Sequence, residues 1–265
     1  MNKILIIGVL YLFSQNISAQ IGGISGSKLT SVNYDVVPHH IIEFEPSFSF
    51  SQTNKYWDNN GELKNLYNST DSISNSSSVQ LRFTYGLFNK LEIGVTVPTD
   101  ISTSSWGFKY ILYQETKVGI SLIGGLNIPL GNSVQDNKIR TAENTIQAGI
   151  GTAFSFQQNE NLSFDFNIQY NNYFEKLNST QSSSIYISSD AGYYIFSKTL
   201  QLIASIGYQK HNFDTIDKYL VTLNSGVTIE TGKNYIIVLN MPVDILGKNI
   251  EKSFGLGLAL TLAIE

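Results

Sequence analysis

Polar and apolar side chains alternate with a period of two along most of the chain. In residues 81–98, LRFTYGLFNKLEIGVTVP, the apolar residues take the odd positions on both sides of FNK, while Arg82 and Glu92 take even ones. Residues 162–174, LSFDFNIQYNNYF, separate their two sides in the same way. Such alternation predicts β-strands with one apolar face. The chain contains about twelve segments of this kind: 40–52, 77–87, 91–99, 104–113, 117–130, 145–157, 162–174, 182–196, 200–210, 218–230, 234–246 and 252–264.

The connections between these segments are of two kinds. Tight turns are predicted at 88–90, 114–116, 159–161, 197–199 and 231–233. Between them lie longer polar connections at 53–76, 131–144, 175–181 and 211–217, and short ones at 100–103 and 247–251. Short turns on one rim and longer loops on the other are typical of outer-membrane barrels, whose even strand count puts both termini on the short-turn side.

The large apolar residues form stripes that need an apolar neighbour. A soluble two-sheet sandwich would pack them on each other, whereas a membrane barrel would turn them to lipid and keep Gln, Asn, Ser and Gly inside. The second arrangement fits the two faces better. We therefore predict an all-β fold, a transmembrane up-and-down antiparallel β-barrel of about twelve strands over residues 39–265. Candidate aromatic girdle residues are Phe50, Tyr85, Trp106, Phe154, Phe156, Tyr170, Tyr208, Tyr219 and Tyr235.

Composition agrees with a surface that faces lipid on one side and water on the other. Charged residues make up 14% of the 265 residues, below the roughly 25% usual for soluble domains. The chain has 15 Tyr, 15 Phe and no Cys, which excludes disulfides, thiolate metal sites and a Cys nucleophile. Its net charge of −4 gives no basic face for nucleic acid, so we expect no nucleic-acid partner.

The first residues predict export. Lys3 precedes an apolar run over 4–13, and Ser18-Ala19 forms a small-residue cleavage site. We predict a signal peptide over 1–19, followed by a short periplasmic N-terminal segment over 20–38. No second apolar stretch of about 20 residues follows. The expected location is the cell outer membrane.

Charged residues on the inward parity are the candidate lumen-lining residues. We expect Arg82 to pair with Glu43 or Glu45 on a neighbouring strand, with Glu92 or Lys109 nearby. Two interpretations stay open: a polar hydrogen-bonded filling of a narrow barrel, or a pore lining that tunes solute preference. Because acids outnumber bases, an aqueous path should prefer cations. The nine candidates are Glu43, Glu45, Arg82, Glu92, Lys109, Asp165, Asp190, Glu230 and Asp244.

Other chemistry is less well supported by the residues. A hydrolase would need a Ser-His-acid arrangement, but His39 and His40 are expected at one rim and His211 at the other, and no G-x-S-x-G elbow is present. Asp58-Asn59-Asn60-Gly61-Glu62 hints at calcium but lacks the full loop pattern and reads as a turn. We therefore predict no enzyme, no catalytic residue, no cofactor and no metal site.

Three stretches resemble one family. Val36-Val37-Pro38 with the following HHIIEFEPSFSFS, the hairpin LRFTYGLFNKLEIGVTVP and the strand WGFKYIL are similar to motifs of the outer-membrane β-barrel transporters named for the MetA pathway of phenol degradation. The match covers residues 36–130. The resemblance implies an envelope location and a barrel related to porins and hydrophobic-compound channels, and no catalytic residue is carried over from it.

These observations lead to one expected function and two alternatives. We expect a channel or transporter for small solutes, with hydrophobic ones among the candidates. A structural or adhesion barrel acting through the 53–76 loop is the second hypothesis, and an outer-membrane hydrolase dependent on His211 is the third. Expected partners are outer-membrane lipid, a small solute and the barrel-assembly machinery, although the last residues, Ala263-Ile264-Glu265, lack the aromatic that many barrels present to that machinery.

Overall fold

The computed structural model describes residues 20–26, 28–67, 72–130, 146–174, 181–196, 199–213, 217–231 and 234–265. The predicted signal peptide, 1–19, lies outside the described residues. So do most of the predicted loops over 131–144 and 175–181 and the middle of 211–217. Among the residues described, no helix is long and apolar enough to cross a membrane.

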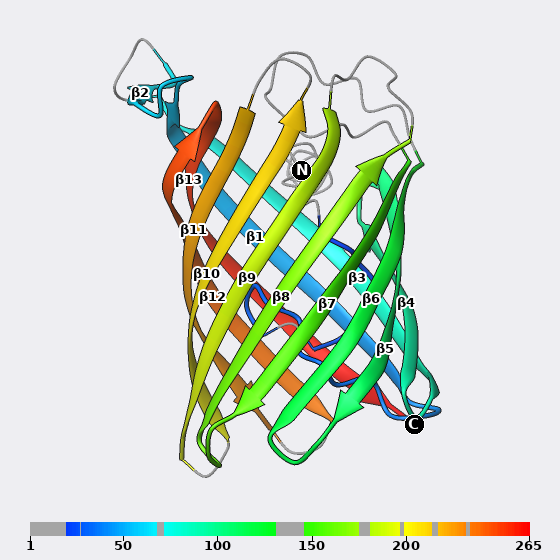
Figure 1. Cartoon of the computed structure of the whole chain (residues 1–265). Coiled ribbons are helices and arrows are strands. Elements are labelled where there is room, and N and C mark those ends of the chain that lie inside the picture. Colours follow the sequence, from blue (N-terminus) through cyan, green and yellow to red (C-terminus); the bar gives the residue numbers. More distant parts are fainter. Residues whose placement is uncertain are drawn as a thin grey trace, which may run out of the picture.

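Twelve long strands form one closed antiparallel ring, as predicted (Figure 1). Each pairs with its neighbour in sequence, and the ring closes where the last strand pairs with the first, Ile42 opposite Ile264. The strands are β1 (Ile42–Trp57), β3 (Ser74–Phe88), β4 (Leu91–Pro98), β5 (Thr103–Gln114), β6 (Val118–Pro129), β7 (Gln147–Gln157), β8 (Leu162–Tyr173), β9 (Gln181–Ile195), β10 (Leu200–Phe213), β11 (Asp217–Glu230), β12 (Tyr235–Lys248) and β13 (Ile250–Ile264).

The region predicted as a loop over 53–76 is more ordered than expected. Strand β1 continues to Trp57, β3 begins at Ser74, and the additional short strand β2 (Leu63–Asn65) pairs with the end of β1. In Figure 1 this extension stands at one rim of the barrel. The extension could not be predicted from the sequence, because its Ser and Asn residues show little alternation of hydrophobicity.

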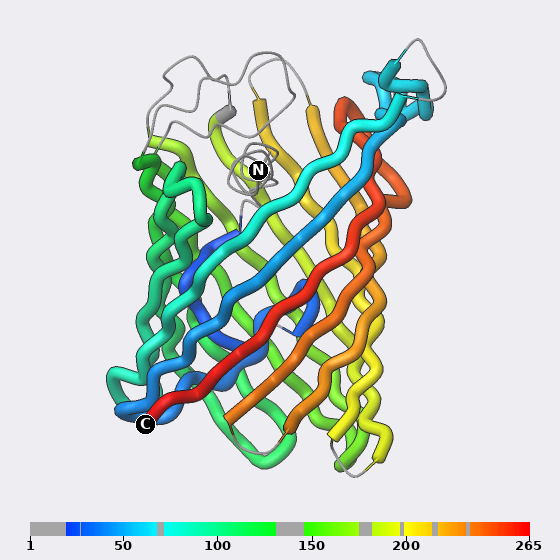
Figure 2. The backbone as a smooth tube through the Cα atoms, turned by 180° about the vertical axis from the view of Figure 1, so that it is seen from behind, coloured from blue at the N-terminus to red at the C-terminus, as the bar shows by residue number. Residues whose placement is uncertain are grey.

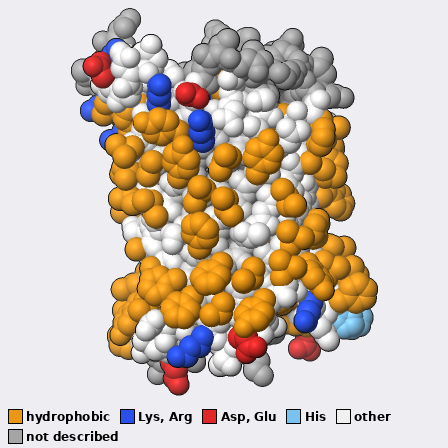
Figure 3. Space-filling view, viewed as in Figure 1, with side chains coloured by type: hydrophobic (Ala, Val, Ile, Leu, Met, Phe, Trp, Pro, Cys, Tyr) orange, Lys and Arg blue, Asp and Glu red, His pale blue; other side chains and the backbone are white. Residues whose placement is uncertain are grey.

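The two faces of each strand separate as the alternation predicted. Phe83 and Ile93 are 45% and 42% exposed on the outside, whereas Arg82 and Glu92 are 7% and 0% exposed on the inside. On the face seen in Figure 3, hydrophobic side chains are spread over the outer wall, and the charged ones lie towards its two ends. Because no protein element covers this wall, its apolar surface suits a lipid environment.

The two rims differ in their connections. Turns join β3 to β4, β5 to β6 and β7 to β8 at what we call the short-turn rim, where β1 begins and β13 ends (Figure 2). The opposite rim, the long-loop rim, carries the β1–β3 extension. Asn249 alone connects β12 to β13 there, with a φ of 53°. This single-residue connection is shorter than the predicted 247–251 loop.

Candidate functional site: the lumen and its N-terminal segment

The described residues of 20–37, namely 20–26 and 28–37, run inside the barrel, and we call this stretch the luminal segment (Figures 1 and 2). Sequence reasoning placed residues 20–38 outside the barrel as a periplasmic segment, and the structure places them against the inward side chains of the wall. The segment forms no ladder with any strand. Several of its backbone N–H and C=O groups are bonded to side chains of the wall, and the Asn33 amide bonds to the Gly26 carbonyl within the segment at 3.0 Å. Buried backbone groups require such partners.

Glu92 on β4 bonds to two separate parts of this segment. Its carboxylate accepts hydrogen bonds from the amide of Ser25 at 2.7 Å, the hydroxyl of Ser25 at 2.6 Å and the amide of Val37 at 2.7 Å. The ammonium of Lys109 on β5 lies 3.4 Å from the same carboxylate and donates to the Ser25 carbonyl at 3.0 Å. Both charged side chains are fully buried. Paired and hydrogen-bonded on all sides, they satisfy the condition under which buried charge is tolerated.

Asp190 on β9 grips the middle of the segment. Its Oδ2 accepts from three consecutive amides, Leu29 at 3.0 Å, Thr30 at 3.2 Å and Ser31 at 3.1 Å, and its Oδ1 accepts from the Thr30 hydroxyl at 2.7 Å. Consecutive amides that converge on one oxygen form an anion-binding concavity. Here the anion is the Asp190 carboxylate of the wall, and the amides of residues 29–31 of the segment form the concavity.

Asp165 lies directly opposite Asp190 in the ladder between β8 and β9. Two acids in this position repel each other. The ammonium of Lys28 lies 2.7 Å from Asp165, and the three amides lie on Asp190. The luminal segment therefore supplies the positive charge and donors that let these two buried acids stand side by side.

Arg82 joins the segment to the first strand. Its guanidinium lies 2.8 Å from Glu45 and 3.6 Å from Glu43, which are the partners expected from the sequence. A second nitrogen donates to the carbonyl of Ile24 at 2.8 Å. Glu92 and Lys109, which were expected near Arg82, form an ion pair with each other.

Among the residues that the structure describes, the remaining two candidates bond to side chains and an amide of the wall. Asp244 on β12 accepts from the hydroxyls of Thr222 and Ser253, both at 2.6 Å. Glu230 on β11 accepts from the hydroxyl of Tyr194 at 2.6 Å. The nine candidates therefore divide into three groups. Five contact the luminal segment directly: Arg82, Glu92, Lys109, Asp165 and Asp190. Glu43 and Glu45 pair with Arg82, and Asp244 and Glu230 bond to the wall.

Apolar side chains also hold the segment. Ile21, Ile24 and Val32 pack with Ile123 and Ala153 of β6 and β7 in a buried cluster. Sequence reasoning missed this cluster and the donors at Ser25, Leu29 and Thr30. The alternation did offer one signal, since Ile123 is a large apolar residue on the inward side of β6, where its neighbours are Ser121 and Gly125.

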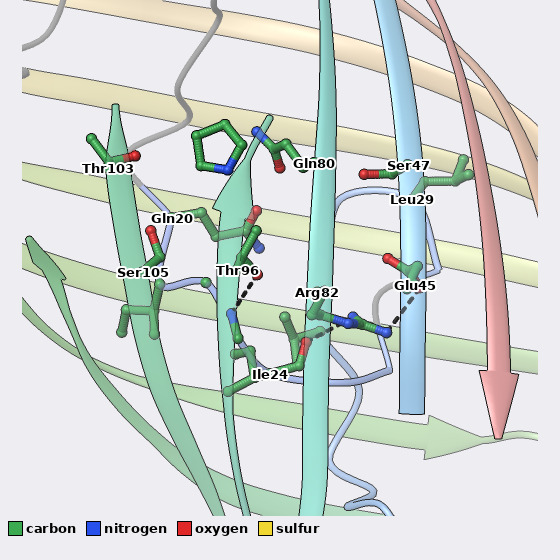
Figure 4. Close-up of a pocket in the computed structure, with 15 residues that line it drawn as sticks. Gln20, Ile24, Leu29, Glu45, Ser47, Gln80, Arg82, Thr96, Thr103 and Ser105 are labelled. Carbon is green, nitrogen blue, oxygen red and sulfur yellow. Dashed lines mark hydrogen bonds and ion pairs between the residues drawn. The ribbon is translucent and has the colours of Figure 1, made fainter. Parts of the chain in front are cut away.

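A cavity of about 280 Å³ remains between the luminal segment and the wall. Its walls come from the segment and from β1, β3, β4 and β5, and the Arg82–Glu45 pair lies at one side of it (Figure 4). This is just below the size range of small-molecule pockets, about 300–1,000 Å³. Hydroxyl and amide groups dominate the labelled lining: Gln20, Ser47, Gln80, Thr96, Thr103 and Ser105.

The residues considered for other chemistry lie towards the two rims, and of the three histidines His211 is buried, on the inward parity of its strand. His39 and His40 stack with ring centroids 3.7 Å apart beside Tyr85 at the short-turn rim, while His211 lies near the far end of β10. Asp58 forms the predicted turn: its carboxylate accepts from the amides of Asn60 and Glu62, both at 2.9 Å, and it pairs with Lys64.

The fold and the apolar outer wall define a transmembrane β-barrel. Residues 44–241 match the family described as "Membrane bound beta barrel domain (DUF5777)", and the chain belongs to this family. The comparison with curated protein sequences returned no match.

Two solved structures with a similar fold are an outer-membrane channel and a porin. The COG4313 outer membrane channel from Pseudomonas putida F1 has a TM-score of 0.70 and 16% identity, covering 89% of this chain and 100% of that one. The KdgM porin in complex with disordered oligogalacturonate has a TM-score of 0.51 and 11% identity, covering 83% and 99%. At these identities the likeness concerns the fold.

Proposed function

We propose that the protein is an outer-membrane channel for small solutes. The observation that carries this proposal is the lumen: a closed barrel encloses polar and charged side chains and retains a cavity of about 280 Å³ beside the luminal segment. A barrel serving only as a membrane anchor would need neither. The similarity of fold to outer-membrane channels supports the proposal.

The finer parts of the proposal concern location, partners and solute. The outer membrane is the expected site, reached by export and insertion through the barrel-assembly machinery, and the apolar outer wall would contact its lipid. The resemblance to the transporters named for the MetA pathway favours transport over catalysis. The hydroxyl and amide lining of the cavity favours a small solute that can form hydrogen bonds, and apolar solutes are the competing class.

Reconstitution tests the proposal. The purified protein is inserted into planar bilayers for current recording and into liposomes for uptake of a small sugar or a small aromatic hydrocarbon. Ser47 lines the cavity, so Ser47→Phe should lower the current and the sugar flux. The matched control is Phe48→Leu, because Phe48 is the next residue and faces outward at 42% exposure. Absence of current and of flux for both solutes would refute the channel.

A further inference from the structure

Four inward glycines lie side by side beneath the luminal segment. Gly94, Gly107, Gly125 and Gly149 pair with one another in sequence across β4, β5, β6 and β7. We call these four residues the glycine row. Four adjacent positions without a Cβ create a shallow trough in the barrel wall, where another backbone can approach closely.

The beginning of the segment fills this trough. A Cβ on Gly94 would overlap the carbonyl of Gly23, and a Cβ on Gly107 would overlap the carbonyl of Gly22. Ile21 would lie 2.6 Å from a Cβ on Gly125 and 2.7 Å from one on Gly149. The glycine row therefore leaves a depression in the wall, which we call the seat, and residues 21–23 occupy it.

The seat holds the segment without making it part of the barrel. The closed ladder from β1 to β13 uses none of its residues. Its bonds to the wall are made to side chains, such as Glu92, Asp190 and Gln169, which accepts from the Ile21 amide at 2.9 Å. The segment could leave with the barrel intact, and its polar groups could exchange wall partners for water in the adjoining cavity.

We propose that residues 20–37 are a displaceable plug, and that the channel passes solute when residues 21–23 leave the glycine row. This inference rests on the proposed channel function. When residues 21–23 occupy the glycine row, the plug closes part of the cross-section of the lumen. When the plug is displaced, the acidic side chains Glu92, Asp165 and Asp190 of the wall are uncovered.

Gly107→Ala is the sharpest perturbation. All three of the nearest atoms to its new Cβ belong to the plug: the Gly22 carbonyl, Ile24 Cγ2 at 3.0 Å and Ile21 Cγ2 at 3.3 Å. The methyl group would therefore disturb the plug and leave the wall unchanged. Gly207→Ala is the matched control, since it also adds a methyl group to an inward strand position but meets only the Tyr186 hydroxyl, at 3.7 Å.

Plug position can be read without any current. Ser188 is 1% exposed and its hydroxyl contacts Ser31 of the plug at 2.9 Å. Because the chain has no Cys, Ser188→Cys introduces a single thiol whose reaction with a water-soluble maleimide reports whether the plug is seated. We expect Gly107→Ala to raise both the labelling rate and the conductance by about twofold or more, consistent with a wider lumen, and Gly207→Ala to change neither.

A reversible crosslink tests the opposite direction. Ser31→Cys with Ser188→Cys places two thiols where two hydroxyls now touch. Oxidation should reduce the current and a reducing agent should restore it, while the two single variants respond to neither. Labelling of the reduced pair confirms that both thiols are present.

The outcomes separate the plug from the channel. Faster labelling in Gly107→Ala with no current in any variant would retain a movable segment and refute the channel. Unchanged labelling and current in Gly107→Ala, together with a current that is the same for the oxidised and reduced pair, would overturn the plug and make the segment a fixed constriction.

Discussion

Asp190 should dominate the energy that holds the luminal segment in place. It is fully buried and accepts four hydrogen bonds from residues 29–31. Asp190→Ala would leave three amides without an acceptor. Hydrogen bonds to a charged group contribute roughly 1.5–3 kcal/mol each, and they are not additive.

The net loss should be smaller than the sum of the four bonds. Removing one member of a buried charged arrangement costs about 3–5 kcal/mol, and losing the repulsion from Asp165 offsets part of it. We therefore expect about 3 kcal/mol, which corresponds to roughly a hundredfold change in the equilibrium between seated and displaced segment.

Hydrogen exchange measures this directly in detergent micelles or bilayer discs. The amides of residues 29–31 should exchange roughly a hundredfold faster in Asp190→Ala. Asp244→Ala is the control, because Asp244 is also buried but its partners are Thr222 and Ser253 of the wall. Equal protection of residues 29–31 in the two variants would refute the assigned role of Asp190.

Three further predictions concern the wall, the outer extension and the charge of the lumen. Leu258 lies on the outward side of β13, and Leu258→Arg should lower the folding free energy in a bilayer by about 2–4 kcal/mol. Leu258→Phe should not lower it. If the two variants are equally stable, Leu258 does not contact lipid. Lys64 and nearby amides lower the pKa of Asp58 from 3.8 to about 2. The ionised Asp58 therefore stabilises the turn above pH 3.8, and this stabilisation is lost as the pH falls towards 2. The rate of proteolysis of the β1–β3 extension should rise over that pH range in the unchanged protein, but not in Asp58→Asn. The reversal potential in a KCl gradient should show cation preference, weakened by Glu43→Gln; anion preference would contradict the acid excess inside.

The sequence was sufficient for the wall because its information is local. Period-two alternation assigns each residue a face without knowledge of any other strand, and consecutive pairing follows once the turns are seen. The pairing of Arg82 with Glu45 was within reach for the same reason, since the two lie opposite each other in neighbouring strands. The β1–β3 extension was missed because Ser and Asn residues give little contrast between faces.

The contents of the lumen were not predictable in the same way. The luminal segment has no periodicity, and its partners are distant in sequence: Ser25 bonds to Glu92 and Leu29 to Asp190. The glycine row becomes visible only once four strands are placed in register. The inward charges form hydrogen bonds and ion pairs, and a cavity remains beside them, so a hydrogen-bonded filling and a pore lining both stay predictions.

Single-channel recording of the full chain beside a variant lacking residues 20–37 tests the central claim most directly. The account predicts current steps from both, larger in the deletion variant because the cross-section occupied by the segment is freed. An absence of current from both proteins, with heat-modifiable migration showing that both barrels are folded, would contradict it.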